Sequence, residues 1–513
     1  MLQRLGRGRL SGVAFAALAS CHTPPTAPEG TPAATTPAAR LVVYIVVDQL
    51  SEELFDAQRA AYTGGLRRMV DGGASAVARH HHAITFTCPG HATLSTGVSP
   101  SVHGIVGNEW RQPSEGTIGD VVYCANADFL RVPTLADQVH AAGGHVVAVA
   151  LKDRAAVMLG GHGADAVAWW ETTTTAWKPT PATPWITAVD ATPWRTRLWV
   201  ARRPELYAAA GLADDQKWER DPGGLGVVFP HPAANTLPPK SFLATPFAGS
   251  ALTDLAIAAL DGDALGADAT PDLLAISYSN VDYVGHSFTG RSWEAHDTML
   301  ALDADLGRLF DMLDARLPGQ YAVVLSADHG AAPPADTRFS LDDVTKACDA
   351  TLASLGLPTG CVLEEPSLWL SPGARTGDRK DEASRAVAAA VTALPGVDGY
   401  AWRTPEGLPA DDARAATLDA IKLSLDDERS GDIYVLYEPG FIPKYPGSEY
   451  AGTSHGTPYD YDQLVPFLAY GAGVKPGALP EVDTRAIAAT AGALIGVAMP
   501  PSAMAPLDAA LAR

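Results

Sequence analysis

The chain has 513 residues, 47% of them apolar, which is enough for one large domain or two to three average ones with a buried core. This composition excludes disorder of the whole chain. The net charge is −21 at pH 7, so the surface repels the phosphate backbone of nucleic acids, and we expect no nucleic-acid partner.

The first 20 residues have the features of a bacterial secretory signal peptide. Three arginines and no acidic residue precede an apolar run that ends in Leu-Ala-Ser-Cys21. This ending is similar to the lipobox at which lipoproteins are cut and acylated; an ordinary signal with a chance cysteine is the alternative. We therefore predict a signal peptide at 1–20 and an exported protein of the periplasm or cell envelope, with a lipid on Cys21 as its only membrane contact.

The next segment, 21–39, is rich in Pro, Thr and Ala and is predicted to be a flexible tether. Further along the chain, no stretch has the roughly 20 apolar residues that a membrane span needs.

Residues 40–513 are predicted to form one α/β domain. Short apolar runs of β-branched residues alternate with Ala-rich segments of helical period, which is typical of a large, mostly parallel sheet with helices on both faces. The strands are predicted at 41–47, 145–151, 272–278, 321–326, 433–437 and 464–470. The helices are predicted at 134–142, 250–260, 293–317, 381–394 and 484–495.

Two segments interrupt this alternation. Residues 169–218 hold seven of the eleven tryptophans, mixed with Thr and Pro, and we predict an inserted cap at about 165–235. Its aromatic residues could line a substrate cleft or only pack a small subdomain. A second insertion is expected at about 342–431, between two strands of the core.

Three of the predicted strands are followed by an aspartate: Asp48, Asp282 and Asp328. In open α/β sheets, ligands bind beyond the carboxyl ends of the strands, so three such carboxylates can meet in one crevice. A single aspartate in this position is usually a turn former or a helix cap. The repetition, together with nearby histidines, indicates a metal site instead.

His286 stands four residues after Asp282, which puts both side chains on one face of a helical turn. His329 follows Asp328 directly, and His455 lies in a glycine-containing loop. Imidazole and carboxylate ligands together suit zinc, which takes about three protein groups at a catalytic site, although Mn, Co or Fe accept the same set. Six ligands divide naturally into two sites.

The segment Thr87-Cys-Pro-Gly-His91 is followed by His103-Gly-Ile, and Asn108 stands 21 residues after Thr87. This arrangement resembles the threonine-nucleophile branch of the alkaline phosphatase superfamily, which includes nucleotide pyrophosphatase/phosphodiesterases and PafA-type alkaline phosphatases. The resemblance runs in the same order along most of the chain and ends at His455. It implies an alkaline-phosphatase-like fold and a metal-dependent hydrolase.

The resemblance also implies roles for single residues. The ligands of one Zn²⁺ would be Asp48, Asp328, His329 and Thr87, and those of a second Zn²⁺ would be Asp282, His286 and His455. Thr87 would attack phosphorus and form a phosphothreonine, because a hydroxyl bound to a divalent cation loses its proton easily. Asn108 would donate a hydrogen bond to a phosphoryl oxygen, while His91 and His103 would support the nucleophile loop.

Lys152 and Arg154 follow the predicted strand 145–151 and so point to the same crevice. In PafA-type monoesterases, a Lys-x-Arg pair at this place contacts the nonbridging phosphate oxygens, whereas diesterases of the branch are expected to have an apolar pocket. A monoester dianion carries one more negative charge, which such cations favour. A solvated charge pair is the alternative. We therefore predict an alkaline phosphatase that releases inorganic phosphate from small phosphate monoesters.

Two other functions stay open. The first is a phosphodiesterase or nucleotide pyrophosphatase of the same superfamily, in which the tryptophan-rich insertion would be a nucleoside-binding cap. The second, more remote, is a noncatalytic metal-binding lipoprotein of the envelope.

The run His80-His81-His82 is expected to pack or to lie at the surface, because three consecutive residues of a strand cannot all face one ion.

Four cysteines follow Cys21, and an even number in an oxidising compartment suggests disulfides. Cys348 and Cys361 flank a short loop-like segment and are the expected pair. Cys88 and Cys124 are the two cysteines that remain, and they could form a second disulfide or could instead be small buried thiols.

Overall fold

The computed structural model describes residues 39–512 apart from 115, 337, 403–414 and 445–451. Residues 1–38 lie outside the described residues, and with them the predicted signal peptide, Cys21 and nearly all of the predicted tether. The described residues belong to one compact unit. Within them, no helix has both the length and the apolar character needed to cross a membrane.

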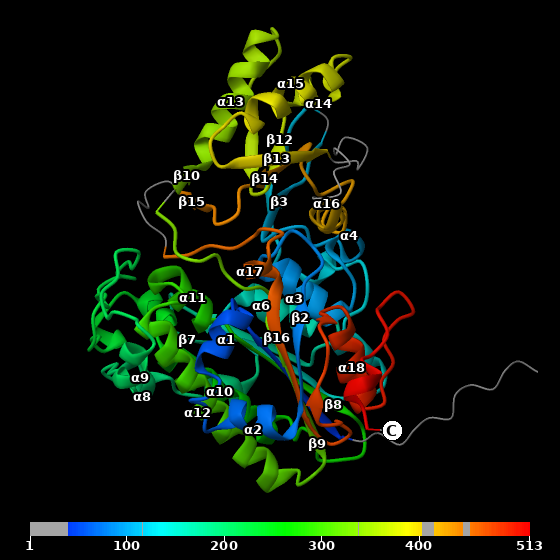
Figure 1. Ribbon diagram of the computed structural model, residues 1–513. Coiled ribbons are helices and arrows are strands. Elements are labelled where there is room, and N and C mark those ends of the chain that lie inside the picture. Colours follow the sequence, from blue (N-terminus) through cyan, green and yellow to red (C-terminus); the bar gives the residue numbers. More distant parts are fainter. Residues whose placement is uncertain (1–38, 115, 337, 403–414, 445–451, 513) are drawn as a thin grey trace, which may run out of the picture. The chain divides into compact units, whose positions relative to one another are not determined.

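A ten-stranded mixed sheet forms the centre of the fold (Figure 1). Its strands are β1 (Leu41–Val47), β2 (Ala74–Arg79), β5 (Val146–Ala150), β6 (Ala166–Glu171), β7 (Ala176–Thr180), β8 (Asp272–Tyr278), β9 (Tyr321–Ser326), β16 (Leu464–Gly471), β17 (Gly477–Ala478) and β18 (Val482–Asp483). The order is β17-β2-β16-β9-β1-β8-β5-β6-β7, and β18 pairs with β2. Strands β9, β1, β8, β5 and β6 are parallel, whereas β16 is antiparallel to both of its neighbours and β7 is antiparallel to β6.

The three central strands β1, β8 and β9 are buried along their whole length. Parallel strands covered on both faces need apolar side chains at every position, which is why these segments were readable as continuous β-branched runs. Their ends are level, because Val47 pairs with Tyr278 and Val46 with Ser326. The residues that follow the three strands therefore start from the same edge of the sheet.

Helices cover both faces of the sheet, as Figure 1 shows. One group of mutually contacting helices is α2 (Gly65–Gly72), α10 (Pro246–Gly262), α11 (Asn280–Phe288) and α12 (Trp293–Arg316). The other is α3 (Thr87–Thr96), α5 (Leu135–Ala141), α6 (Asp153–Gly160) and α18 (Ala486–Leu494). The first group contacts β8 through α10, and the second contacts it through α5 and α6. The predicted α/β class is confirmed, and each predicted helix ends within four residues of an observed one.

The second insertion is a small α/β subdomain with its own antiparallel sheet, β11-β12-β14-β13, and a parallel pair β10-β15. Its elements are β10 (Arg338–Ser340), α13 (Leu341–Ser354), β11 (Val362–Glu364), β12 (Ser367–Trp369), α14 (Pro372–Thr376), α15 (Lys380–Thr392), β13 (Val397–Trp402), α16 (Ala415–Lys422), β14 (Ile433–Tyr437) and β15 (Ile442–Lys444). The expectation that 433–437 returns to the central sheet is wrong. A buried β-branched run has the same sequence pattern in either kind of sheet.

The tryptophan-rich segment begins with β6 and β7, which belong to the central sheet, so the inserted part starts only after β7. It continues with the short helices α7 (Pro184–Thr187), α8 (Thr192–Arg195) and α9 (Pro204–Ala209). Trp199 is buried and its indole N–H donates to Asp297 at 2.7 Å, while Trp194 donates to Asp254 at 2.5 Å. These rings anchor the segment to α10 and α12.

Asp303 on α12 holds the start of α2, the helix packed against it. Its carboxylate accepts hydrogen bonds of 2.7 to 3.2 Å from four backbone N–H groups, those of Thr63, Gly64, Leu66 and Arg67. The first N–H groups of a helix have no partner inside the helix, and here one carboxylate satisfies them.

Replacing Asp303 by alanine would leave these donors without partners, so we expect Asp303→Ala to lower the free energy of unfolding by about 3 kcal/mol. The control Asp311→Ala removes an exposed carboxylate from the same helix and should cost less than about 0.5 kcal/mol. Urea denaturation followed by tryptophan fluorescence measures both. Equal losses in the two variants would contradict this role of Asp303.

Candidate metal centre

The level ends of β1, β8 and β9 bring the three predicted aspartates together. Asp48 follows β1 directly, Asp328 follows β9, and Asp282 lies in the first turn of α11, which begins after β8. All three side chains are buried. The sheet thus gathers residues that are up to 280 positions apart along the chain, from 48 to 328, into one place.

Asp48, Asp328 and His329 form one group whose ligand atoms all lie within 4.8 Å of one another. The Nε2 atom of His329 is 3.5 Å from Asp48 Oδ1 and 3.4 Å from Asp328 Oδ2. These three residues offer two carboxylates and one imidazole, a set that suits a divalent metal ion.

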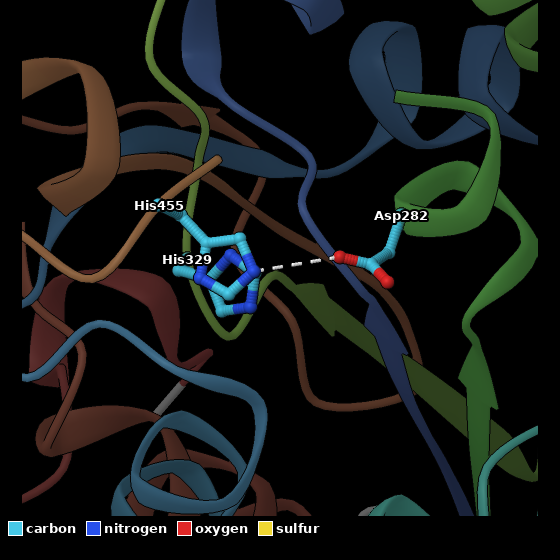
Figure 2. Close-up of side chains that lie close together, drawn as sticks. All are labelled: Asp282, His329 and His455. Carbon is cyan, nitrogen blue, oxygen red and sulfur yellow. Dashed lines mark ion pairs between the residues drawn. The ribbon is translucent and has the colours of Figure 1, made fainter. Parts of the chain in front are cut away.

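The second group surrounds the carboxylate of Asp282. Its Oδ1 atom lies 3.1 Å from His286 Nε2 and 3.7 Å from His455 Nε2. Figure 2 shows the rings of His329 and His455 stacked opposite this carboxylate, with their centroids 3.7 Å apart. Because the ligand atoms of Asp282, His329 and His455 also lie within 4.8 Å of one another, the two groups are adjacent.

All three histidines are held in the form that binds metal through Nε2. In each ring, Nδ1 faces a backbone carbonyl, which can only accept, so Nδ1 carries a proton and Nε2 is the atom turned toward the carboxylates. The carbonyls are those of Thr453 for His286 at 2.9 Å, Gly330 for His329 at 2.9 Å and Thr85 for His455 at 2.8 Å.

Asp48 Oδ1 and His329 Nε2 are buried and have no hydrogen-bond partner among the described residues. Burial together with the charge of Asp328 raises the pKa of Asp48 to about 7. Burial and the neighbouring rings of His329 and His286 lower the pKa of His455 well below its usual range, which keeps this imidazole neutral. A divalent cation would satisfy the unpartnered atoms and compensate the crowded carboxylates, so the residues present fit a metal in each group.

Thr87 is the first residue of α3 and is buried beside the two groups. Its Oγ1 atom lies 3.4 Å from the ammonium nitrogen of Lys152. The same ammonium lies 2.8 Å from Asp48 Oδ2 and 2.6 Å from Asp282 Oδ2. Lys152 therefore connects the hydroxyl of Thr87 to one carboxylate of each group.

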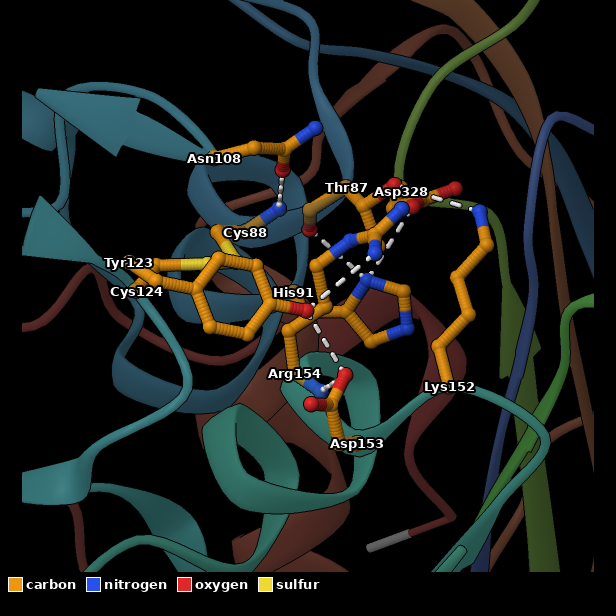
Figure 3. The surroundings of a disulfide bond; sticks show 10 residues. All are labelled: Thr87, Cys88, His91, Asn108, Tyr123, Cys124, Lys152, Asp153, Arg154 and Asp328. Atoms are coloured by element: carbon orange, nitrogen blue, oxygen red, sulfur yellow. Dashed lines mark hydrogen bonds and ion pairs between the residues drawn. A yellow bond between two sulfur atoms is a disulfide. The ribbon is translucent and has the colours of Figure 1, made fainter. Parts of the chain in front are cut away.

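Asn108 and Arg154, both labelled in Figure 3, line a cleft of about 330 Å³ together with Tyr123. The Oδ1 atom of Asn108 accepts a hydrogen bond from the backbone N–H of Cys88 at 3.0 Å, and no described residue accepts from its Nδ2. Arg154 donates to the hydroxyl of Tyr123 at 3.4 Å, and that hydroxyl donates to Asp153 at 2.7 Å.

Both disulfides considered from the sequence are formed. Cys348–Cys361 links α13 to the segment before β11. Cys88–Cys124 joins the second residue of α3 to the loop after β4 (Val121–Tyr123), which pairs with β3 (Glu109–Arg111). The second disulfide therefore fixes the start of the Thr87 helix to the hairpin that follows Asn108 (Figure 3).

His91 supports Thr87, in the way the sequence resemblance implies. Its Nδ1 lies 2.8 Å from the carbonyl oxygen of Thr87 and 3.0 Å from Asp328 Oδ2, and its Nε2 lies 2.8 Å from Ser277 Oγ. Gly90 allows this close approach, because a Cβ atom there would lie 2.2 Å from the carbonyl oxygen of Asp328.

Sequence reasoning missed the network that holds His455. Asp462 is fully buried and accepts hydrogen bonds from the backbone N–H of Thr457 at 2.8 Å and from its hydroxyl at 2.6 Å. The hydroxyl of Thr85 donates to the carbonyl of Thr457 at 3.0 Å, and the carbonyl of Thr85 accepts from His455. No motif spacing links these residues, so no signal in the sequence pointed to them.

Sequence reasoning also missed Gln49, which bridges the two groups. Its backbone N–H donates to Asp328 Oδ1 at 3.1 Å, and its side-chain amide donates to Asp282 Oδ1 at 2.9 Å. Its backbone has a positive φ of 66°, a strained conformation for a residue with a side chain. Gly285 leaves room for the amide, since a Cβ there would lie 1.9 Å from Gln49 Oε1.

Comparisons with known proteins agree with this geometry. The family model described as type I phosphodiesterase / nucleotide pyrophosphatase matches residues 42–458. The chain is 31% identical to alkaline phosphatase PhoK of Sphingomonas sp, over 91% of this chain and 90% of that protein. It is 28% identical to alkaline phosphatase PafA of Elizabethkingia meningoseptica, over 91% and 93%. A crystal structure of PafA matches with a TM-score of 0.84 and 26% identity, over 93% of this chain and 100% of that one.

The position of Gln49 gives a testable prediction. Gln49→Ala removes the hydrogen bond from the side-chain amide to Asp282, a candidate metal ligand. Losses of this kind weaken metal binding by about 10-fold to 100-fold. We expect Gln49→Ala to bind zinc at least about tenfold more weakly in competition with a chromophoric chelator. Gln138→Ala, on α5 and away from both groups, is the control and should match the unchanged protein. Equal zinc affinities in the two variants would rule out the bridging role.

Proposed function

Since this chain belongs to the type I phosphodiesterase/nucleotide pyrophosphatase family of the alkaline phosphatase superfamily and is a phosphatase, we propose that its preferred substrates are small phosphate monoesters. The observation that carries the proposal is the buried ammonium of Lys152, 3.4 Å from the hydroxyl of Thr87. A cation at this distance favours a phosphoryl group with two negative charges over one with a single charge.

Two divalent ions, zinc by the nature of the ligands, complete the proposed site. The proposed ligands are Asp48, Asp328, His329 and Thr87 for one ion, and Asp282, His286 and His455 for the other. When bound, such ions supply positive charge that stabilises the entering and leaving oxygens and eases deprotonation of a bound hydroxyl.

Thr87 is the proposed nucleophile. Its oxygen forms a bond to phosphorus while the bond to the leaving-group oxygen breaks, which gives a phosphothreonine and an alcohol. Water then attacks the same phosphorus, releases inorganic phosphate and restores the hydroxyl of Thr87. Its place at the N-terminus of α3 supports this role, because the helix dipole favours negative charge there.

Asn108 and Arg154 are proposed to hold the nonbridging phosphoryl oxygens. The backbone N–H of Cys88 donates to the amide oxygen of Asn108, so the amide nitrogen of Asn108 is the group that can donate to phosphate. Arg154 lines the same cleft with a guanidinium that can bind two oxygens at once. Together with Lys152, these groups match the charge and the donors of a phosphate dianion.

A phosphodiesterase is the second candidate, because Phe86 and Tyr123 line the same cleft and could receive a second ester group. The tryptophans give this alternative no support. No tryptophan of the described residues lines the clefts beside the metal centre, and Trp199 is buried against Asp297. Export of the protein and a lipid on Cys21 stay predictions from the sequence.

The Thr87→Ala variant should retain its fold and its metal, yet lose at least about 10³-fold in kcat/KM for p-nitrophenyl phosphate, because no hydroxyl remains to attack phosphorus. Thr87→Ser, which keeps a hydroxyl, is the control and should retain measurable activity. Metal analysis and a thermal melt accompany the kinetics. Full activity in Thr87→Ala would disprove the mechanism.

The charge argument predicts unequal effects on two substrates. For Arg154→Ala we expect kcat/KM to fall about 100-fold with p-nitrophenyl phosphate and less than about tenfold with bis(p-nitrophenyl) phosphate. Lys178→Ala, an exposed cation on β7, should change neither value. The monoesterase proposal fails if the unchanged enzyme has the higher kcat/KM with the bis-ester, or if Arg154→Ala lowers both values equally.

A further inference from the structure

A second cleft, of about 590 Å³, adjoins the candidate metal centre and has no part in the proposed reaction at Thr87. His286, Tyr283 and Ser287 of α11 form one wall. The other walls come from the loop that begins at Arg220 and from the 3-10 helix η3 (Pro239–Ala244), which carries Lys240. The cleft therefore opens directly beside a proposed metal ligand.

Hydrogen bonds fix the walls of this cleft. The backbone N–H of Arg220 donates to the carbonyl of Ser287 at 2.8 Å, which ties the loop to α11. The hydroxyl of Ser241 donates to the carbonyl of Gly223 at 3.1 Å, which ties the loop to η3. Asp221 closes the loop on itself by accepting from two backbone N–H groups, at 2.6 and 3.1 Å. These bonds tie the three walls of the cleft to one another.

The place of the cleft matches the side on which the leaving group departs. In an in-line displacement, the leaving oxygen departs opposite the attacking oxygen, and in a two-metal site the second ion stabilises it. In the proposed site, Thr87 is a ligand of the same ion as Asp48, so the leaving oxygen would face the group of Asp282 and His286. Since His286 lines the cleft, the rest of the leaving group extends into it.

The charge of this cleft differs from that of the protein as a whole. Among the described residues that line it, two are cations, Arg220 and Lys240, and one is a carboxylate, Asp221, in a chain whose net charge is −21. Lys240 is exposed, and its ammonium makes no ion pair within the described part of the chain. In the cleft beside Asn108 the balance is reversed, because three carboxylates, Glu109, Glu364 and Glu365, line it with one cation, Arg154.

We propose that the cleft between Arg220, Lys240 and His286 is a leaving-group subsite that selects phosphate monoesters whose leaving group carries a second anionic group, such as a carboxylate. The proposal rests on the proposed function, because it needs a phosphate ester held at Thr87. Arg220 and Lys240 act through charge attraction in a partly exposed cleft, so their effect is moderate and sensitive to salt.

Two substrates that differ only at the far end of the leaving group test the proposal. 3-Phosphoglycerate ends in a carboxylate where glycerol 3-phosphate ends in a hydroxymethyl group. At low ionic strength we expect kcat/KM to be about tenfold higher for 3-phosphoglycerate, and 0.5 M NaCl should remove most of this preference. A ratio of one or less at low salt would overturn the subsite.

The double variant Arg220→Ala/Lys240→Ala should bring the ratio of the two kcat/KM values close to one. A ratio measured on one preparation does not depend on the fraction of folded or metal-loaded enzyme, so partial misfolding cannot imitate the result. Lys475→Ala removes an exposed cation remote from the cleft and should keep the tenfold ratio. An unchanged ratio in the double variant would overturn the proposal.

The experiment distinguishes failure of the subsite from failure of the proposed function. If the unchanged enzyme hydrolyses p-nitrophenyl phosphate but does not prefer 3-phosphoglycerate, the subsite is wrong and the proposed function stands. If it hydrolyses no monoester at all, the proposed function is wrong and the subsite is wrong with it.

Discussion

Three carboxylates buried at one edge of a parallel sheet are the constraint on which the rest of the site depends. Asp48, Asp282 and Asp328 repel one another, and burial removes the water that would otherwise screen them. Such a cluster is stable only where cations compensate it. Lys152 provides one positive charge. The three imidazoles turned toward the carboxylates can bind metal ions, which would provide further positive charge. The surrounding residues hold this crowded set in place.

Much of the fold could be predicted because its centre obeys simple rules. β1, β8 and β9 have the predicted bounds, since a fully covered parallel strand needs apolar residues throughout. The strand at 433–437 was assigned to the wrong sheet, because burial alone does not say which partner a strand has. The true start of the insertion after β7 was missed, because an edge strand containing Pro179 lacks a clear pattern.

The candidate site, like the fold, could be predicted only in part. The proposed ligands and the proposed nucleophile were recognisable because each follows a strand or lies in a motif of fixed spacing, as Asp48 and Thr87 do. Gln49, Thr85 and Asp462 were not, because their contacts arise from packing between segments far apart in the chain. Residues that only orient others leave little trace in one sequence, since many side chains can donate or accept a hydrogen bond.

The level strand ends have a consequence for how the protein matures. The proposed ligands that meet at one sheet edge come from residue 48 to residue 455, so an emerging or C-terminally truncated chain that lacks the last of them would have no complete site. Contacts between such distant segments also slow folding, because long loops must close before any contact stabilises them. Catalysis therefore begins only when nearly the whole polypeptide has been synthesised and folded. A complete centre is present only in such a chain.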